Sequence, residues 1–226
     1  TKKVIKNTLS YLTIFSLVFS SLMINTANAA DITLTGNQTV TQADKNGDGN
    51  AVDTMGNDDI LVVTGTGVSM NSAGGAITAG GIEFNSSAAT TLTTSGANAI
   101  NISTAGGAGG DIVVTDNTGV STLTLGTDFN ILGSVTNTGG AGTRDLIITI
   151  ASGKTLDFVT AGEVSNAAIS GAGEVEISNA FTTTGNINIT GNLDIDGALT
   201  VTGASIAAAT LALDANIVGT ATSVTI

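Results

Sequence analysis

The chain of 226 residues contains no cysteine, histidine, proline or tryptophan. Without His or Cys, it cannot form a Ser-His-Asp triad, a Cys nucleophile or a zinc site of the usual Cys/His kind. Its glycine clusters also lack the strand–Gly–helix setting of a phosphate-binding loop. Because disulfides are impossible, an exported fold must be stabilised by backbone pairing and aliphatic packing.

Aromatic residues are also few, at 3% of the chain. Beyond residue 30 they are only Phe84, Phe129, Phe158 and Phe181. A compact core normally uses large aromatic side chains, each of which buries roughly 150–250 Å². Here Val, Ile, Leu and Ala must fill the interior, which indicates a thin core in an elongated structure.

The first 29 residues have the layout of a secretory signal peptide. Lys2, Lys3 and Lys6 form a basic start, Leu9–Ile24 is apolar, and Ala27-Asn28-Ala29 is an A-x-A cleavage signal. The mature chain is therefore expected to begin near Ala30. An uncleaved anchor is the alternative, although the apolar stretch is short for a membrane span of about 20 residues.

Positive charge is scarce in the rest of the chain. All 18 acidic residues lie after residue 30, where only Lys45, Arg144 and Lys154 are basic, so this region carries a net charge of 3 − 18 = −15. Nucleic-acid binding relies on Lys and Arg to neutralise phosphates, and anionic membranes have the same requirement. Nucleic acid is therefore not expected as a partner, and binding to anionic membranes is disfavoured.

The region from residue 30 to 226 consists of short β-prone runs separated by Gly, Asn and Asp. Runs such as Ile32–Gly36, Asp111–Asp116 and Leu146–Gly153 alternate apolar residues with Thr, Ser or Asn, which predicts strands with one buried face. Ala207–Ala215 is the nearest approach to an amphipathic helix, but its surroundings favour strand.

A six-residue repeat begins at residue 185. Gly185, Gly191, Gly197 and Gly203 recur every six residues, and Ala209 and Ala215 continue the series. Side chains at i and i+2 share one strand face, and a small residue suits the corner between strands. The predicted inward pairs are Ile187 and Ile189, Leu193 and Ile195, Leu199 and Val201, Ser205 and Ala207, Leu211 and Leu213, and Ile217 and Gly219.

These patterns predict an all-β protein, an elongated parallel β-helix (β-solenoid) with irregular coils over 30–184 and hexad-repeat coils over 185–226. Gly-rich stretches such as 74–81, 104–111 and 138–145 interrupt the first part and are expected to form loops on the solenoid. Linkers between separate β-sandwich domains are the alternative. Because the pattern continues to residue 226, we expect a fragment of a longer chain.

One motif suggests a metal. Asp44, Asn46, Asp48 and Gly49 fit the opening of a calcium loop, D-x-[DN]-x-[DN]-G. The twelfth position is Met55, where the pattern requires a bidentate Glu. A solvated Asn/Asp/Gly turn spanning Asp44–Asp53 is therefore the preferred interpretation, with calcium as the alternative. No metal ligand, cofactor-binding residue or catalytic residue is assigned.

Paired carboxylates are the one feature of the sequence that is compatible with catalysis. Glu174 and Glu176 lie two residues apart, as do Asp194 and Asp196, and a spacing of about 6.5–7 Å along a strand would suit glycoside hydrolysis. However, Asp194 and Asp196 alternate with apolar residues, so they are predicted to face solvent. The Thr-x-Thr pieces Thr91–Thr93 and Thr182–Thr184 suggest an ice-binding ladder, but they are not expected to recur in register.

With its leader ending in Ala-Asn-Ala-Ala and its Gly/Asn/Thr/Ala-rich strands, the chain resembles the passenger region of autotransporter surface proteins. Gly133–Phe158 is similar in style to the large rickettsial surface cell antigens. The resemblance implies a β-helical passenger on the surface of a Gram-negative bacterium, with a role in adhesion or as a surface coat. It also implies a C-terminal transmembrane barrel beyond this sequence. The hexad section alone is similar to bactofilin or phage-fibre repeats, which lack such a leader.

We therefore expect a non-enzymatic, exported protein of the cell surface or outer membrane, which presents loops such as Thr104–Gly110 on a rigid acidic stalk. The expected partner is a host-cell or surface receptor, or further copies of the chain, bound through many weak contacts. Two alternatives stay open: a polysaccharide-acting β-helix enzyme that uses clustered carboxylates, and a self-assembling coat protein.

Overall fold

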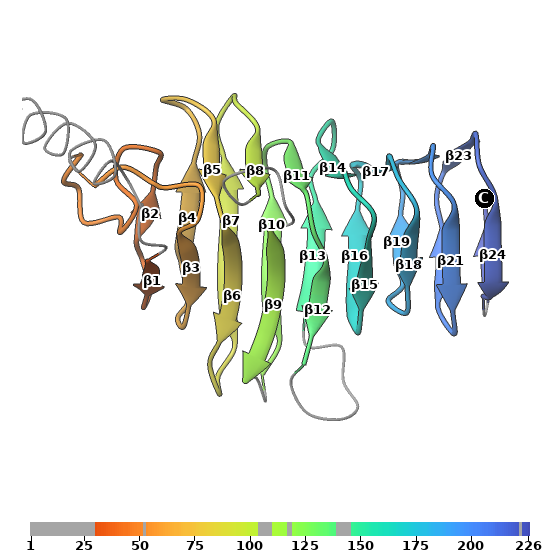
Figure 1. The fold of residues 1–226 in the computed structure, drawn as a ribbon, viewed down its shortest axis with the longest axis horizontal. Helices are drawn as coiled ribbons and strands as arrows, with labels where there is room; N and C mark the ends of the chain where they lie inside the picture. Colours follow the sequence, from red (N-terminus) through yellow and green to blue (C-terminus); the bar gives the residue numbers. More distant parts are fainter. Residues whose placement is uncertain (1–29, 52, 104–109, 117–118, 139–145, 222) are drawn as a thin grey trace, which may run out of the picture.

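The computed structural model describes residues 30–51, 53–103, 110–116, 119–138, 146–221 and 223–226. Short strands stack side by side along one axis and form a rod, with β1 near one end and β24 at the other (Figure 1). The predicted signal peptide (1–29) lies outside the described residues, as do most of the loops 104–110 and 138–145.

The chain winds through three parallel sheets in a fixed order and adds one strand to each sheet per coil, except that the first and last coils add no strand to the third sheet. The first sheet, here sheet A, has nine strands: β1 (Asp31–Leu34), β3 (Ile60–Val63), β6 (Gly81–Asn85), β9 (Asp111–Asp116), β12 (Val135–Asn137), β15 (Gly162–Ser165), β18 (Phe181–Thr183), β21 (Leu199–Thr202) and β24 (Ile217–Thr220).

Sheet B also has nine strands: β2 (Thr39–Val40), β4 (Val68–Asn71), β7 (Thr90–Ser95), β10 (Ser121–Leu125), β13 (Leu146–Ile150), β16 (Ala167–Gly171), β19 (Ile187–Ile189), β22 (Ser205–Ala207) and β25 (Ser223–Thr225). Sheet C has seven: β5 (Ile77–Ala79), β8 (Ile100–Ile102), β11 (Phe129–Ile131), β14 (Thr155–Phe158), β17 (Glu174–Ile177), β20 (Asn192–Ile195) and β23 (Thr210–Leu213).

This architecture confirms the predicted all-β parallel solenoid. The sheets run without interruption across residues 184 and 185, so the alternative of separate β-sandwich domains is wrong. Ala207–Ala215 contains β23 and the end of β22 and is not helical. Within the described residues, no helix is long and apolar enough to cross a membrane.

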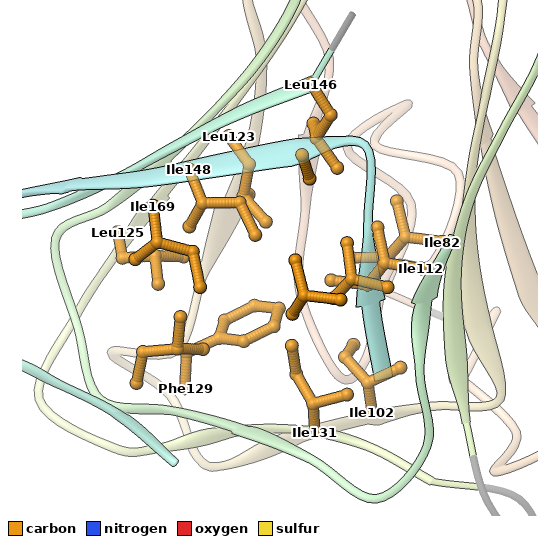
Figure 2. Close-up of a cluster of buried hydrophobic side chains, with 14 of the residues drawn as sticks. Ile82, Ile102, Ile112, Leu123, Leu125, Phe129, Ile131, Leu146, Ile148 and Ile169 are labelled. Carbon is orange, nitrogen blue, oxygen red and sulfur yellow. The ribbon is translucent and has the colours of Figure 1, made fainter. Parts of the chain in front are cut away.

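The interior is a column of aliphatic side chains that all three sheets contribute (Figure 2). Burial alternates along most strands, as in β13, where Leu146, Ile148 and Ile150 are buried while Ile147 and Thr149 face outward. The four Phe residues beyond the leader are all buried, and the rings of Phe158 and Phe181 lie 4.4 Å apart between sheets C and A. This is the thin aliphatic core that the composition predicts.

The hexads form the sides of the coils, three hexads to a turn. Asn192 pairs with Thr210 at an offset of 18 residues, and Leu199 pairs with Ile217 at the same spacing. In the irregular part the offset is larger, for example 31 residues between Thr90 and Ser121, because loops leave the corners there. The six-residue period therefore reports the length of one side when no loop is inserted.

The prediction of inward residues is wrong in the fourth hexad. Ser205 and Ala207 face outward, and Ala204, Ile206 and Ala208 are buried instead. The register explains the shift, since Ile187 pairs with Ile206 and not with Ser205, which the hexad spacing would place opposite it. The additional residue is accommodated at the corner, where Gly203 has a φ of +65°, a conformation that glycine adopts without strain.

The last predicted pair on sheet C is also less buried than expected. Leu213 is 46% exposed, although its partner Ile195 is fully buried. β23 is the end strand of sheet C, so no further strand covers it. Leu211 and Ile217, on the same end coil, are only partly buried.

Candidate functional site

Charge is distributed unequally over the three sheets. The nine strands of sheet B contain no acidic or basic residue. Sheet A carries Asp31, Glu83, Asp111, Asp116 and Glu163, and sheet C carries Asp157, Glu174, Glu176 and Asp194. The rod therefore has two acidic faces and one uncharged face.

On sheet C, acidic side chains form a ladder across neighbouring coils. Asp157 on β14 pairs with Glu176 on β17, which pairs with Asp194 on β20. Adjacent strands lie about 4.8 Å apart, so the three carboxylates follow one another at roughly this interval on the outer face. Leu193 and Ile195, which flank Asp194, are fully buried, so Asp194 faces outward as the alternation predicts.

The ladder shifts the titration of its members. Burial raises the pKa of the Asp157 carboxyl, a hydrogen bond from Ser178 Oγ (3.0 Å) opposes that shift, and the charge of Asp196 adds to it. The pKa of Glu176 is also raised, by burial first and then by the surrounding carboxylates of Asp157, Asp194, Asp196 and Glu174. Carboxyls that share a site in this way ionise less readily than isolated ones.

Sequence reasoning identified Glu174, Glu176, Asp194 and Asp196 but missed Asp157. The spacing in the sequence could have pointed to Asp157, because Asp157, Glu176 and Asp194 follow one another at intervals of one coil. A shallow groove of about 320 Å³, lined in part by Gly153, Gly173 and Gly191, reaches Glu174 at the corner between sheets B and C. Acid ladder and groove are thus neighbours along sheet C.

The uncharged face of sheet B carries a row of hydroxyl side chains in register. Thr91 and Thr93 on β7 pair with Thr122 and Thr124 on β10, so the expectation that Thr-x-Thr pieces do not recur in register is wrong for this pair. Thr149 and Ser170 continue the outer row on the next two coils. The chain between β7 and β10 is long enough to hide this correspondence in the sequence.

The predicted calcium loop lies at the start of the solenoid, between β2 and β3. The Asp44 carboxylate, 8% exposed, accepts hydrogen bonds from the backbone N–H of Asp48 (3.2 Å) and Gly49 (2.8 Å). Asn46 Nδ2 donates to Asp48 Oδ2 (3.3 Å) and Asp53 Oδ2 (3.2 Å). The side chains thus close an Asn/Asp/Gly turn through hydrogen bonds of their own.

The same loop covers the beginning of the core. Met55 is buried with the interior column, and Gln42 Nε2 donates to the Met55 carbonyl (2.8 Å). Gln42 Oε1 accepts from the backbone N–H of Thr78 (3.0 Å) on β5, the first strand of sheet C. Residues 41–51 and 53–59 therefore cap the open edge of sheet C, a position where an unpaired strand invites aggregation.

Among the residues that the structure describes, no group of three or more His, Cys, Asp or Glu side chains is placed to hold a metal ion. No protein-family model, no curated protein and no solved structure matches the chain. The candidate sites are the three surface features described above: the acid ladder, the uncharged face and the N-terminal cap.

Proposed function

We propose that the chain is an exported structural or adhesive protein of the bacterial cell surface, whose acidic solenoid is a stalk that presents loops and faces to a receptor. The observation that supports this most strongly is the continuous interior column. It joins all three sheets from β1 to β22 and gives a stiff rod without requiring disulfides. Loops inserted at the corners of the coils can vary without disturbing the packing of the interior side chains.

The chemistry of the faces is consistent with binding rather than turnover. Every aromatic side chain of the described residues is buried, so these residues offer no exposed ring for stacking against sugars or bases. The acidic faces oppose contact with nucleic acid and anionic lipid. Sheet B is an uncharged surface along the whole rod, on which many weak contacts could add.

The test is to express the chain, followed by whatever continues it in its gene, in a Gram-negative host and to shave intact cells with protease. We expect the protein to be accessible at the surface, and beads coated with it to adhere to target cells more than beads coated with an unrelated acidic protein. Recovery in the cytoplasm alone would contradict the proposal.

A self-assembling coat is the second candidate, and the uncharged face favours it. Two rods of high negative charge meet with least repulsion through sheet B. Thr93→Glu with Thr124→Glu would place charges on this face, and Thr182→Glu with Thr200→Glu is the matched control on sheet A. If lateral assembly is the function, electron microscopy should show arrays for the wild type and the control, but not for the sheet B variant.

A polysaccharide-acting enzyme is the third candidate, supported by the adjacent carboxylates of Asp157 and Glu176 on the outer face of sheet C, whose pKa values are raised. Asp157→Asn and Glu176→Gln would abolish turnover of a cleaved glycan, whereas Asp214→Asn, beyond the ladder, would not. Absence of glycan cleavage by the unmutated protein would remove this candidate.

A further inference from the structure

A second carboxylate, distant from the acid ladder, has an environment that the adhesive role does not explain. Asp59 is 4% exposed and lies just before β3. Its carboxylate accepts hydrogen bonds from three donors: the backbone N–H of Gly56 (2.7 Å), the backbone N–H of Ala30 (3.0 Å) and Lys45 Nζ (3.2 Å). It therefore ties the cap loop to the beginning of the first strand.

Both backbone groups of Ala30, the N–H and the carbonyl, form hydrogen bonds. While its N–H donates to Asp59, its carbonyl accepts from the N–H of Ile60 (3.0 Å), and the next residue, Asp31, pairs with Ile60 in the register of β1 and β3. The nitrogen of Ala30 is thus fixed against a buried carboxylate. A buried carboxylate is stable only when it is well paired, and Lys45 supplies the one cation that contacts it among the described residues.

The sequence places the predicted cleavage point at the same nitrogen. Ala27-Asn28-Ala29 directs a leader-removing endopeptidase to the bond between Ala29 and Ala30. Hydrolysis of that bond consumes one water: the carbonyl carbon of Ala29 gains the hydroxyl and becomes a carboxylate, and the nitrogen of Ala30 gains protons and becomes an ammonium. A neutral donor to Asp59 is replaced by a charged one.

We propose that Asp59 is the receptor for the mature amino terminus, and that removal of the leader completes an Ala30 ammonium–Asp59 ion pair that locks the N-terminal cap. Charge-assisted hydrogen bonds are about twice as strong as neutral ones, so the cap is tighter after processing than before it. The proposal rests on cleavage of the leader and is independent of the adhesive role.

The first test uses the full precursor, with an initiating Met, exported from a Gram-negative host. Amino-terminal sequencing of the product should give Ala30 as the first residue. A precursor with one Ser inserted between Ala29 and Ala30 moves the α-amino group one residue away from Asp59. We expect its product to melt about 2–6 °C lower, from the difference between a charge-assisted and a neutral hydrogen bond and the usual Tm response of a chain this long.

A double-mutant cycle shows whether Asp59 is responsible. In an Asp59→Asn background the Ser insertion should cost little further Tm, because the ion pair is already lost. Asp31→Asn is the matched control: it removes an exposed carboxylate next to Ala30 and should leave the effect of the insertion unchanged.

The second readout is chemical and does not depend on the Asp59 variant folding. An amine-reactive ester at pH 7 labels a free α-amino group in preference to lysine, because the α-amino group has the lower pKa. We expect Ala30 of the wild type to be labelled at least tenfold more slowly than the amino terminus of the Ser-insertion product. Equal labelling rates, a first residue other than Ala30, or the same Tm loss with and without Asp59 would each overturn the proposal.

Discussion

Asp157 on β14 lies directly opposite Glu176 on β17, so the parallel register sets two carboxylates beside each other on the outer face of sheet C. In a parallel stack, identical positions of successive coils are always neighbours. Like charges that recur once per coil therefore repel one another along the rod, and this repulsion can be measured.

Glu176→Gln should stabilise the protein. The glutamine keeps the shape of the side chain and removes a charge that lies among Asp157, Asp194, Asp196 and Glu174. Like charges opposite each other on a sheet are destabilising, and with solvent screening we expect a gain of about 0.5 kcal/mol, measured by thermal or denaturant melts at pH 7. Glu163→Gln on sheet A is the control. A lower Tm for Glu176→Gln would contradict the ladder.

Stability should rise as the pH falls from 7 through the raised folded-state pKa values of Asp157 and Glu176. The pKa values of Asp157 and Glu176 are raised in the folded state, so above the unfolded values of about 3.9 and 4.3 the folded state binds more protons than the unfolded one. The contribution of these groups is present at low pH and is lost as the pH rises through the folded pKa. In the Asp157→Asn, Glu176→Gln double variant this pH dependence should be weaker.

At more acidic pH the trend should reverse. Burial alone would raise the pKa of Asp59, but the N–H groups of Gly56 and Ala30 and the ammonium of Lys45 outweigh it and hold the pKa below its ordinary value. This stabilisation is present above the unfolded pKa and is lost as the pH falls below about 4. Melts from pH 7 to 3 should therefore pass through a maximum, and the fall on the acid side should be smaller in Asp59→Asn.

Ile148→Ala and Ile147→Ala test the inward and outward assignment on a single strand. Ile148 is fully buried in the interior column, whereas Ile147 faces outward on β13 (Figure 2 labels Ile148). We expect a loss of about 2–5 kcal/mol for Ile148→Ala, from transfer and cavity costs. Ile147→Ala should cost less than about 1 kcal/mol. Similar losses for both would mean that the register of β13 is different.

Gly185→Ala should be destabilising because the corner has no room for a side chain. A Cβ there would collide with the carbonyl oxygen of Ala167 in the preceding coil. Gly74, which has open space at that position, is the matched control. We expect a loss of about 1–3 kcal/mol for Gly185→Ala and no loss for Gly74→Ala, measured by denaturant melts.

Asp44→Ala should loosen the cap. Its buried carboxylate satisfies the N–H groups of Asp48 and Gly49, and leaving such donors unpaired costs about 1–3 kcal/mol. Because the carboxylate is already engaged by backbone donors, we expect chelator or excess calcium to leave the wild-type Tm unchanged. A calcium-dependent rise in Tm that Asp44→Ala abolishes would instead establish the metal interpretation.

The periodicity of the sequence was sufficient to predict the fold, because the corners after residue 185 are short and each side of a coil occupies one hexad. It failed at Gly203, where one additional residue shifts Ala204, Ile206 and Ala208 inward. A single residue at a corner reverses the face of the following strand, and nothing in the hexad pattern marks it.

The ladder of Asp157, Glu176 and Asp194 and the paired Thr-x-Thr strands were harder to predict for a related reason. Both depend on which residues of successive coils are opposite one another, and that requires the length of every coil. The coil length changes wherever a loop leaves a corner, so contacts between coils cannot be read from local patterns. The Asp59–Ala30 contact, 29 residues apart, belongs to the same class.

The short turn of three hexads, which sets Leu199 beside Ile217, has an evolutionary consequence. Each coil contacts only the coils directly before and after it. Duplicating one such turn in the gene would therefore lengthen the rod by about 4.8 Å and preserve the contacts between the other coils. Insertions of an odd number of residues would instead reverse which side chains of the following strand face inward, as the single additional residue at Gly203 does. The length of the rod is therefore a property that this architecture can adjust in small, tolerated steps.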